Sequence, residues 1–209
     1  MKMTDKIVEY FDEIIPNPHC ELNFSKDYEL LIDVMLSAQT TDKRVNSVVD
    51  VLYKKYPTLE ALSNANIEDI MKIIKPIGTF HKKANNIKNI TNRLINDRNG
   101  IVPNDRAYLE SLPGVGRKTT NVVLSILFDE PYIAVDTHVS RVSIRLGLAS
   151  PNDDVLKIEQ KITKKFKKYN LGRLHHQFVL FGRYYCKARN PECSSCKLYD
   201  ICKYKNKQK

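Results

Sequence analysis

Apolar residues recur at helical spacing along almost the whole chain, and no segment keeps the two-residue alternation of a strand for long. The nine prolines fall mostly at the edges of these stripes, and Asn99-Gly100 follows one of them, as is typical of helix ends. We therefore predict an all-α protein of about ten short helices. The apolar stripes that carry this prediction are Ile7, Phe11 and Ile14; Leu30, Val34 and Ala38; Ile67, Ile70, Met71 and Ile74; Ala84, Ile87, Ile90, Leu94 and Ile95; Val139, Val142 and Leu146; Val155, Ile158 and Ile162; and Leu174, Phe178 and Phe181.

The positive charge of the chain is concentrated near its C-terminus. Hydrophobic residues make up 42% and charged residues 28% of the 209 residues, which is typical of a globular protein rather than a disordered one. The net charge is +10, and residues 152–209 hold 15 basic and 5 acidic side chains, so the rest of the chain is neutral overall. Such a patch attracts polyanions, and nucleic acid is the leading candidate.

The apolar runs exclude a membrane-spanning class. The longest of them, such as Val122–Leu124 and Ile126–Phe128, are far too short to span a bilayer. The first residues, Met1 to Lys6, become charged at once and contain no apolar signal core. We therefore expect a cytoplasmic protein that associates with the nucleoid through DNA.

Four cysteines near the C-terminus indicate a metal centre. Cys186, Cys193, Cys196 and Cys202 form the pattern C-x6-C-x2-C-x5-C, and four adjacent thiolates would repel one another without a cation or cluster. Zinc and an iron–sulfur cluster both accept four thiolates. Zinc ribbons usually have two C-x2-C knuckles and this segment has one, which favours the cluster. Cys20 is interpreted as an ordinary thiol.

The segment Leu112-Pro113-Gly114-Val115-Gly116-Arg117-Lys118-Thr119 combines a glycine turn with a helix start. The free N–H groups of such a start suit an anion such as a DNA phosphate, although a hairpin that needs glycine for geometry alone is the alternative. Lys118 shares the apolar edge of this helix with Val122 and Ile126, while Arg117 and Asn121 share a more polar edge. A lysine there is either a solvated side chain or a desolvated, nucleophilic amine in a cleft.

Asp136 follows the apolar stretch Ile133 to Val135 and precedes a helix. It is therefore predicted to be an N-cap, a role that still allows its carboxylate to face a cleft. From the residues alone, His138 is interpreted as a hydrogen-bonded structural histidine. His175 and His176 are rejected as a pair of metal ligands because adjacent helical residues face different directions.

Together these segments resemble the endonuclease III family of DNA glycosylases. The resemblance rests on LSAQTTD at 36–42, LPGVGRKT at 112–119, VDTHV at 135–139, HHQFVLFGRYYC at 175–186 and the cysteine spacing. It implies a two-lobed, all-α helix-hairpin-helix glycosylase fold with DNA bound across the cleft between the lobes. Residues 20–130 would form a six-helix barrel containing the helix-hairpin-helix at about 106–128. Residues 1–19 and 131–209 would form the second lobe, with a [4Fe-4S] loop at 186–202.

The resemblance also implies a reaction. The chain would act as a monomer on double-stranded DNA that contains damaged pyrimidines or abasic sites, as a bifunctional glycosylase and lyase of base excision repair. Lys118 would be the nucleophile and Asp136 would assist it. The four cysteines would hold one [4Fe-4S] cluster per chain. The DNA contacts would come from Gln39, Gly114, Val115, Gly116, His138, Lys187 and Arg189, and Lys197 and Lys203 are further candidates.

One departure from the family pattern affects DNA recognition. Thr79 and Phe80 stand where the family commonly has leucine and tyrosine, so a wedge toward the opposite strand would have less apolar volume. Two other classes of protein remain alternatives. One is a monofunctional glycosylase of different base specificity, which would generally lack a lysine at position 118. The other is a non-catalytic DNA-binding protein whose four cysteines hold zinc.

Overall fold

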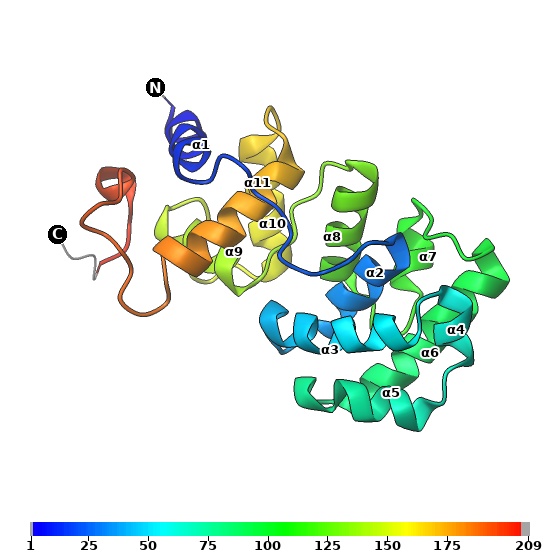
Figure 1. Cartoon of the computed structure of the whole chain (residues 1–209). Coiled ribbons are helices and arrows are strands. Elements are labelled where there is room, and N and C mark those ends of the chain that lie inside the picture. Colours follow the sequence, from blue (N-terminus) through cyan, green and yellow to red (C-terminus); the bar gives the residue numbers. More distant parts are fainter. Residues whose placement is uncertain (1, 206–209) are drawn as a thin grey trace. The chain divides into compact units, whose positions relative to one another are not determined.

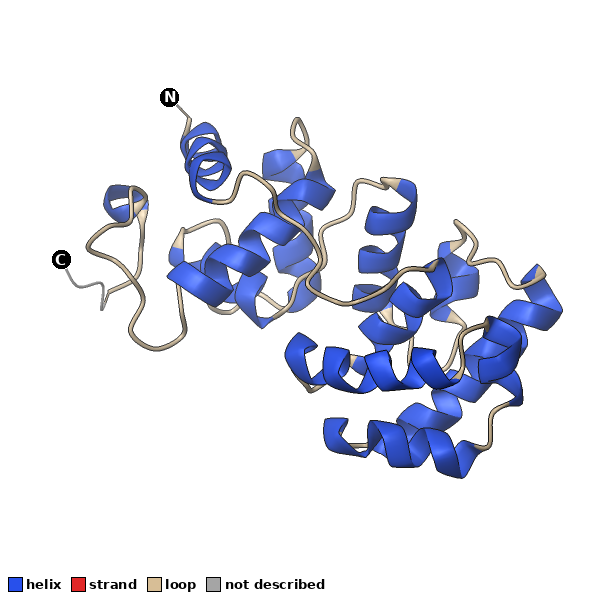
Figure 2. Cartoon of the chain, viewed as in Figure 1, coloured by secondary structure: helices blue, strands red, loops and turns tan. Residues whose placement is uncertain are grey.

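Helices are the only regular secondary structure in residues 2–205, the part of the chain that this computed structural model describes (Figures 1 and 2). The all-α prediction is therefore confirmed for these residues. The chain divides into two compact units, one formed by Met1–Cys20 with Asp129–Lys209 and the other by Glu21–Phe128. No helix within residues 2–205 is both long enough and apolar enough to cross a membrane.

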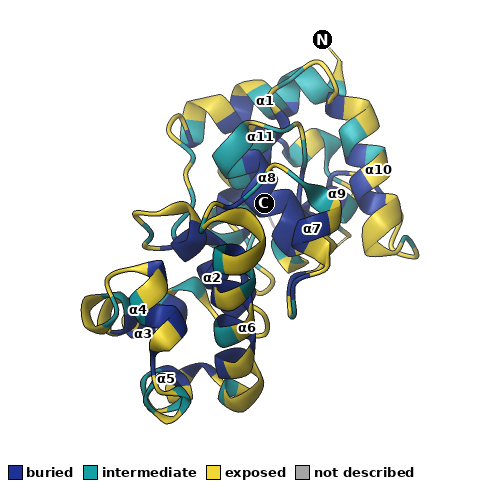
Figure 3. Ribbon diagram, turned by 90° about the vertical axis from the view of Figure 1, so that its right-hand side faces the viewer, coloured by how far each residue is buried: buried dark blue, intermediate teal, exposed yellow. Residues whose placement is uncertain are grey.

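The unit Glu21–Phe128 is built around a helix that is buried on nearly all sides. Helix α2 packs against α3, α6 and α8, and nine of its ten residues are buried, because its sequence is apolar around most of its circumference. Helix α6 carries buried, intermediate and exposed residues in turn (Figure 3). The helices of this unit are α2 (Asp27–Leu36), α3 (Asp42–Lys55), α4 (Leu59–Asn64), α5 (Ile67–Ile74), the 3₁₀ turn η1 (Lys75–Ile77), α6 (Phe80–Arg98), α7 (Arg106–Glu110) and α8 (Arg117–Phe128).

The other unit is held together by an aromatic core that includes the N-terminal helix. Phe11 packs edge-on against Phe178 with 5.1 Å between ring centroids, and Phe178 in turn packs against Phe166. The contact between Phe11 and Phe178 joins residues 167 positions apart, so α1 packs with the C-terminal helices. The helices are α1 (Met3–Ile14), α9 (Thr137–Arg145), α10 (Val155–Phe166), α11 (Leu171–Leu180), the π-helical turn η2 (Phe181–Tyr185) and the 3₁₀ turn η3 (Tyr199–Ile201).

Side-chain caps fix where many of these helices begin. In each case the side-chain oxygen of the residue before the helix accepts a backbone N–H from the first turn, which would otherwise lack a partner. The predicted cap at Asp136 is confirmed, with its carboxylate 2.8 Å from the Val139 nitrogen. The other caps of this kind are Thr41, Thr58, Asn66, Asp105, Asp154 and Asn170.

Two of the predicted apolar stripes extend too far. Ala38 lies beyond the end of α2 and is exposed, because the chain turns at Gln39 before α3 begins. Val155 is the first residue of α10 and is 54% exposed. Ala38 keeps the apolar spacing beyond the end of α2, where the backbone no longer follows the period of 3.6 residues, whereas Val155 is helical but exposed in the first turn of α10.

Helix α2 also buries two carboxyl groups, which accept different numbers of hydrogen bonds. Glu29 accepts hydrogen bonds from the backbone nitrogens of Ser25 and Lys26 and from the Ser25 hydroxyl. Asp33 is fully buried and accepts one hydrogen bond from the Tyr53 hydroxyl at 2.5 Å. Burial raises the pKa of Asp33 to about 8, although the Tyr53 hydrogen bond lowers it, and the nearby carboxylates of Glu29 and Asp50 raise it further.

We expect Asp33→Asn to remove a pH dependence of stability. Between about pH 4 and 8 the folded chain keeps the Asp33 proton and the unfolded chain has lost it, so the free energy of unfolding falls as the pH rises. Relative to the variant, the native protein should lose about 2 to 4 kcal/mol between pH 5 and 8. Urea unfolding at several pH values measures this difference. Glu68→Gln, at an exposed position of α5, should leave the slope unchanged, and parallel curves for the native protein and Asp33→Asn would contradict the assignment.

Candidate functional site

The loop between α7 and α8 forms a hairpin that only glycine permits at one position. Gly114 has a φ of +80°, and a Cβ atom there would lie 2.2 Å from the Asn86 side-chain nitrogen. Gly116 is exposed, has open space around it, and accepts the Thr120 N–H at 3.0 Å as α8 begins. The hairpin therefore presents the start of a helix on an exposed backbone, and the first N–H groups of a helix have no acceptor within the helix itself.

Lys118 lies in the first turn of α8, directly after this hairpin, and it is exposed. Val122 on the same edge is buried and Ile126 is half-buried, so the register predicted from the sequence is present but Lys118 projects beyond it. The free protein therefore does not desolvate this amine. Val115 is only 4% exposed and its backbone N–H donates to the Leu112 carbonyl at 3.1 Å, so a contact between this N–H and a ligand would have to replace that bond.

The predicted polar edge of α8 is wrong at Asn121. Arg117 is exposed, but Asn121 is fully buried, and its side-chain oxygen accepts a hydrogen bond from the Arg106 guanidinium at 2.7 Å. Arg106 lies on α7, so this bond joins the two helices of the hairpin. A buried amide is tolerated because a charged donor satisfies it.

Gln39 lies in the short turn between α2 and α3. It is exposed and has a φ of +60°, a backbone conformation that is uncommon for a residue other than glycine. Thr79, directly before α6, is also exposed and has a φ of +44°, which is rarer still for a β-branched residue. Such strained positions concentrate at functional sites, and both belong to the segments singled out by the family resemblance.

In the other unit, Asp136 and His138 lie at the start of α9. His138 is half-buried, with Nδ1 3.2 Å from the Arg141 guanidinium. Burial lowers the pKa of His138, and Arg141 and Arg183 lower it further, although Asp136 raises it. The imidazole is therefore neutral near pH 7, so any contact it makes with a phosphate would be a hydrogen bond rather than an ion pair.

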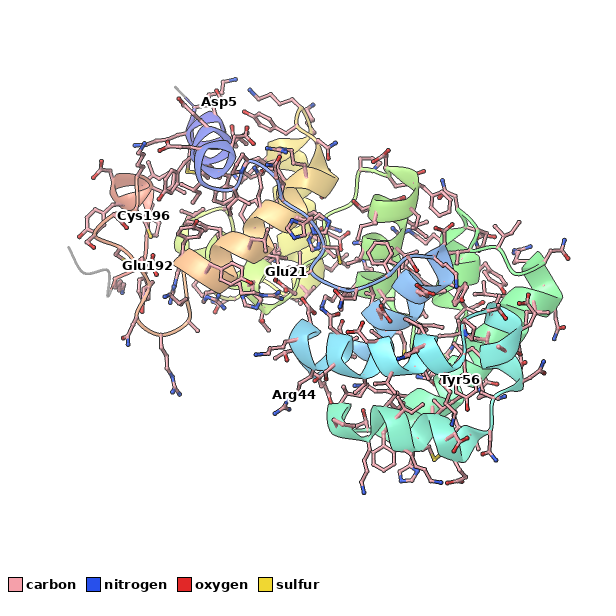
Figure 4. All side chains as sticks on the ribbon, in the orientation of Figure 1. Asp5, Glu21, Arg44, Tyr56, Glu192 and Cys196 are labelled. Atoms are coloured by element: carbon pink, nitrogen blue, oxygen red, sulfur yellow. The ribbon has the colours of Figure 1, made fainter. Side chains whose placement is uncertain are left out.

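The four C-terminal cysteines line a single cavity. Its walls also include Tyr10, Arg145, Phe181, Leu198 and Tyr204, and it encloses about 480 Å³ including its open mouth. Figure 4 shows Cys196 and Glu192 in the C-terminal segment beside α1. Burial raises the pKa of the Cys186 and Cys196 thiols, so a set of thiolates is disfavoured here without positive charge in the cavity.

The four cysteines supply the type of donor that an iron–sulfur cluster requires. All four lie in the wall of the same cavity. Thiolates spread over the walls of one cavity are the donor set that a larger iron–sulfur core accepts.

Arg145 organises the loop that carries these cysteines. Its side chain is 8% exposed and donates to the carbonyls of Lys187 at 2.7 Å and Ala188 at 3.2 Å, and it lies 3.3 Å from the Cys186 sulfur. The Tyr204 ring covers the guanidinium at 4.0 Å. Arg141 adds hydrogen bonds to the carbonyls of Gly182 and Cys186. No local pattern pointed to these two arginines, because the carbonyls they bind in this loop lie more than forty positions away.

The basic side chains around the cysteines differ in how available they are. Arg189 and Lys203 are exposed. Lys187 forms an ion pair with Glu192 at 2.8 Å, and Lys197 forms one with Glu13 at 2.5 Å. Exposed pairs of this kind are weak and exchange readily, so they reduce but do not abolish the attraction for a phosphate.

Comparisons with known proteins agree with this geometry. Residues 32–168 match the family described as HhH-GPD superfamily base excision DNA repair protein, and residues 186–202 match the iron-sulfur binding domain of endonuclease III. Endonuclease III from Bacillus subtilis is 42% identical, covering 97% of this chain and 93% of the relative. Endonuclease III from Escherichia coli K12 is 47% identical, covering 92% and 90%. A solved structure of a trapped covalent endonuclease III–DNA intermediate superposes with a TM-score of 0.90 at 43% identity, covering 97% of this chain and 96% of that one.

These matches define a helix-hairpin-helix enzyme of base excision repair. Within that superfamily, the chain belongs to the endonuclease III family, and the resemblance drawn from its motifs is confirmed. It is a bifunctional DNA glycosylase and abasic-site lyase that acts on DNA, and it carries a [4Fe-4S] cluster.

The surroundings of Gly114 and Gly116 predict that replacing them by alanine has different effects on stability. Gly114→Ala should lower the free energy of unfolding by about 2 to 4 kcal/mol, because it adds both a left-handed backbone penalty and a steric clash with Asn86. Gly116→Ala should change it by less than about 1 kcal/mol, since no atom lies near and φ is not positive. Thermal unfolding of both variants measures the contrast. Equal losses would show that the close approach of Asn86 does not constrain this turn.

Proposed function

We propose that this enzyme removes oxidised pyrimidines from duplex DNA and cleaves the resulting abasic site through an imine formed on Lys118. The observation that carries the proposal is the position of Lys118: an exposed amine in the first turn of α8, directly behind the Gly114–Gly116 hairpin. An amine there can reach a sugar whose flanking phosphate binds the hairpin N–H groups. We further propose that the enzyme works on chromosomal DNA in the cytoplasm.

The first step replaces the bond to the base. The target nucleotide must leave the stack, because C1′ is shielded inside the duplex. The Lys118 nitrogen attacks C1′, the bond between C1′ and the base breaks, and the base departs with the bonding electrons and takes up a proton. Loss of a proton from the nitrogen and opening of the sugar ring then give the imine.

Asp136 would act on the charge that develops in this step. As the bond to the base breaks, positive charge builds on the sugar, and a carboxylate stabilises it and moves protons to and from Lys118. Its cap to the Val139 nitrogen holds the carboxylate in a fixed orientation at the start of α9. The cap and the catalytic role are compatible, because the cap engages one carboxylate oxygen, Oδ1.

The second step cleaves the strand. The imine makes the C2′ protons acidic, so a base removes one, a double bond forms between C2′ and C3′, and the 3′ phosphate leaves with the electron pair. Hydrolysis then returns the free Lys118 amine. One side chain thus supplies both the glycosylase and the lyase activity.

The remaining contacts would position the DNA. Gln39 would fill the gap left by the flipped nucleotide, and its exposed, strained turn supports this role. The backbone of Gly114, Val115 and Gly116 would bind phosphate, as would the remaining candidate side chains. Those side chains are His138, Lys187, Arg189, Lys197 and Lys203.

Cys186, Cys193, Cys196 and Cys202 would hold the cluster, which ties down the C-terminal segment and orients its basic loop. When bound, it supplies the positive core that buried thiolates require. The hydrogen bonds from Arg145 and Arg141 would hold the loop in the shape that receives it. The reaction on the sugar is carried out by the side chains described above.

We expect Lys118→Gln to abolish imine formation. Borohydride should trap the native protein on DNA that carries an oxidised pyrimidine, and the variant should bind this DNA but lose trapping and strand cleavage together, with excision at least about 10³-fold slower. Arg117→Gln, which removes a neighbouring exposed charge, should still be trapped at saturating protein. Normal trapping by Lys118→Gln would show that another amine is the nucleophile, and excision by native protein without trapping would indicate a monofunctional enzyme.

A matching test separates the two roles of Asp136. Asp136→Asn keeps a side-chain oxygen for the cap and removes the charge, so the fold should be retained while excision slows by about 10² to 10⁴-fold. Asp136→Ala should lose excision and also destabilise the protein by about 1 kcal/mol. Single-turnover excision and thermal unfolding measure the two effects. An Asn variant with native excision rates would exclude a role for the carboxylate.

The ligand set makes a compositional prediction. Anaerobically purified protein should contain about four iron and four sulfide per chain, and alanine at any of the four cysteines should lower both. Cys20→Ala is the matched control and should leave both unchanged. Colourless protein with stoichiometric zinc and no sulfide would contradict the assignment.

A further inference from the structure

A buried lysine connects the two strained turns of the unit Glu21–Phe128. Lys83, in the first turn of α6, is 5% exposed. Its ammonium donates to the carbonyl of Ala38 at 3.0 Å and to the carbonyl of Ile77 at 3.2 Å. Ala38 directly precedes Gln39, and Ile77 directly precedes the Gly78–Thr79 turn.

This ammonium has no acidic partner in the described part of the chain. Its two acceptors are neutral backbone carbonyls, and burial alone lowers the pKa of Lys83. A buried cation without a carboxylate is costly, and an apolar side chain of similar length would fill the same space at lower cost. The reason for a lysine at this buried position therefore lies in the two backbone carbonyls to which it donates hydrogen bonds.

The two carbonyls belong to the peptide groups that set the unusual backbone angles. The Ala38 oxygen is part of the peptide whose nitrogen is that of Gln39, so fixing this plane restricts the φ of +60° at Gln39. The Ile77 oxygen is part of the peptide that leads into Gly78, whose φ is +70°. The Lys83 backbone nitrogen also donates to the Thr79 carbonyl at 3.1 Å. One residue thus restrains both turns.

We propose that Lys83 is a positioning residue that holds the Gln39 turn and the Gly78–Thr79 turn as one preformed unit for entering the DNA duplex. The inference rests on the proposed function, in which Gln39 occupies the gap left by the flipped nucleotide. A preformed turn matters at this step. If the turn had to become ordered on binding, the loss of conformational entropy would reduce the free energy of DNA binding.

This role separates duplex substrates from unpaired ones. Entering a duplex requires the turns to compete with stacking and pairing, whereas an abasic site in an unpaired bubble is already accessible. Loss of Lys83 should therefore slow imine formation on a paired substrate and spare it on a bubble of the same sequence. Affinity for undamaged duplex, which depends on phosphate contacts, should change little.

The same helix provides a matched control. Lys88 is half-buried on α6, and its ammonium also donates to two backbone carbonyls, that of Ser63 in the last turn of α4 and that of Ala65 directly after this helix. Lys88→Met removes the same chemistry from a turn that carries no proposed DNA contact. It should cost stability in the same way as Lys83→Met, and so it corrects for a purely structural effect.

The experiment measures single-turnover borohydride trapping on a duplex with one abasic site and on the matching bubble. Lys83→Met should lower the duplex rate at least about tenfold and keep the bubble rate within about twofold. Lys88→Met should leave the ratio of the two rates unchanged. Lys83→Arg, which can donate to both carbonyls, should restore much of the trapping rate on the duplex. If Lys83→Met does not fold, Lys83→Gln serves instead, because it removes the charge and keeps a donor.

The outcomes distinguish this inference from the proposed function. A native protein that is trapped on neither substrate would overturn the proposed function and, with it, the role of Lys83. If the native protein is trapped normally, the ratio of the duplex rate to the bubble rate tests Lys83. A ratio for Lys83→Met equal to that of the native protein or of Lys88→Met would overturn the role of Lys83 alone. A parallel fall on duplex and bubble would also overturn it, because it would show a general loss of the active site.

Discussion

The peptide groups at the ends of short helices are the constraint on which this structure depends. Each helix leaves four N–H groups and four carbonyls without partners inside it. The α-helices here have between 5 and 19 residues, so such groups form a large share of the backbone. Side-chain caps satisfy many of them, and the candidate functional residues lie at the same places: Lys118 in the first turn of α8, Asp136 before α9, and Gln39 and Thr79 in turns that lead into helices. The polar groups that the fold must satisfy at these ends are also those that can face a ligand.

The sequence predicted the features that depend on short-range spacing. The helices follow from apolar stripes of period 3.6, and the Asp136 cap follows from its place between an apolar run and a helix. Helix ends were less predictable, because apolar spacing can continue past the helix, as at Ala38, or include an exposed residue of the first turn, as at Val155. The partner of Asn121 could not be predicted either, since a polar residue on a helix is buried or exposed according to what the next helix brings to it.

Contacts between distant residues account for what spacing could not reveal. The Lys83 ammonium binds a carbonyl 45 positions away, Arg145 binds carbonyls more than 40 positions away, and Asp33 meets Tyr53 on the next helix. Each is a buried charged or titratable group whose hydrogen-bond partners include a residue far along the chain. Lys83 did carry a local signal, because it stands in helical register with the buried Ile87, Ile90 and Leu94. Lys118 stands in a similar register with the buried Val122, but of the two lysines only Lys83 is itself buried.

Lys83 and Lys118 differ in whether the amine is buried in the fold or accessible to a ligand. The Lys83 amine donates to two backbone carbonyls, and its burial keeps it away from DNA. Lys118 shares an apolar register with Val122 but is exposed, so its amine is accessible to a ligand. Arg145, buried and always charged, resembles Lys83 in binding backbone carbonyls. Buried basic side chains at these two positions therefore hold turns and loops in place, and the amine proposed as the nucleophile is an exposed one.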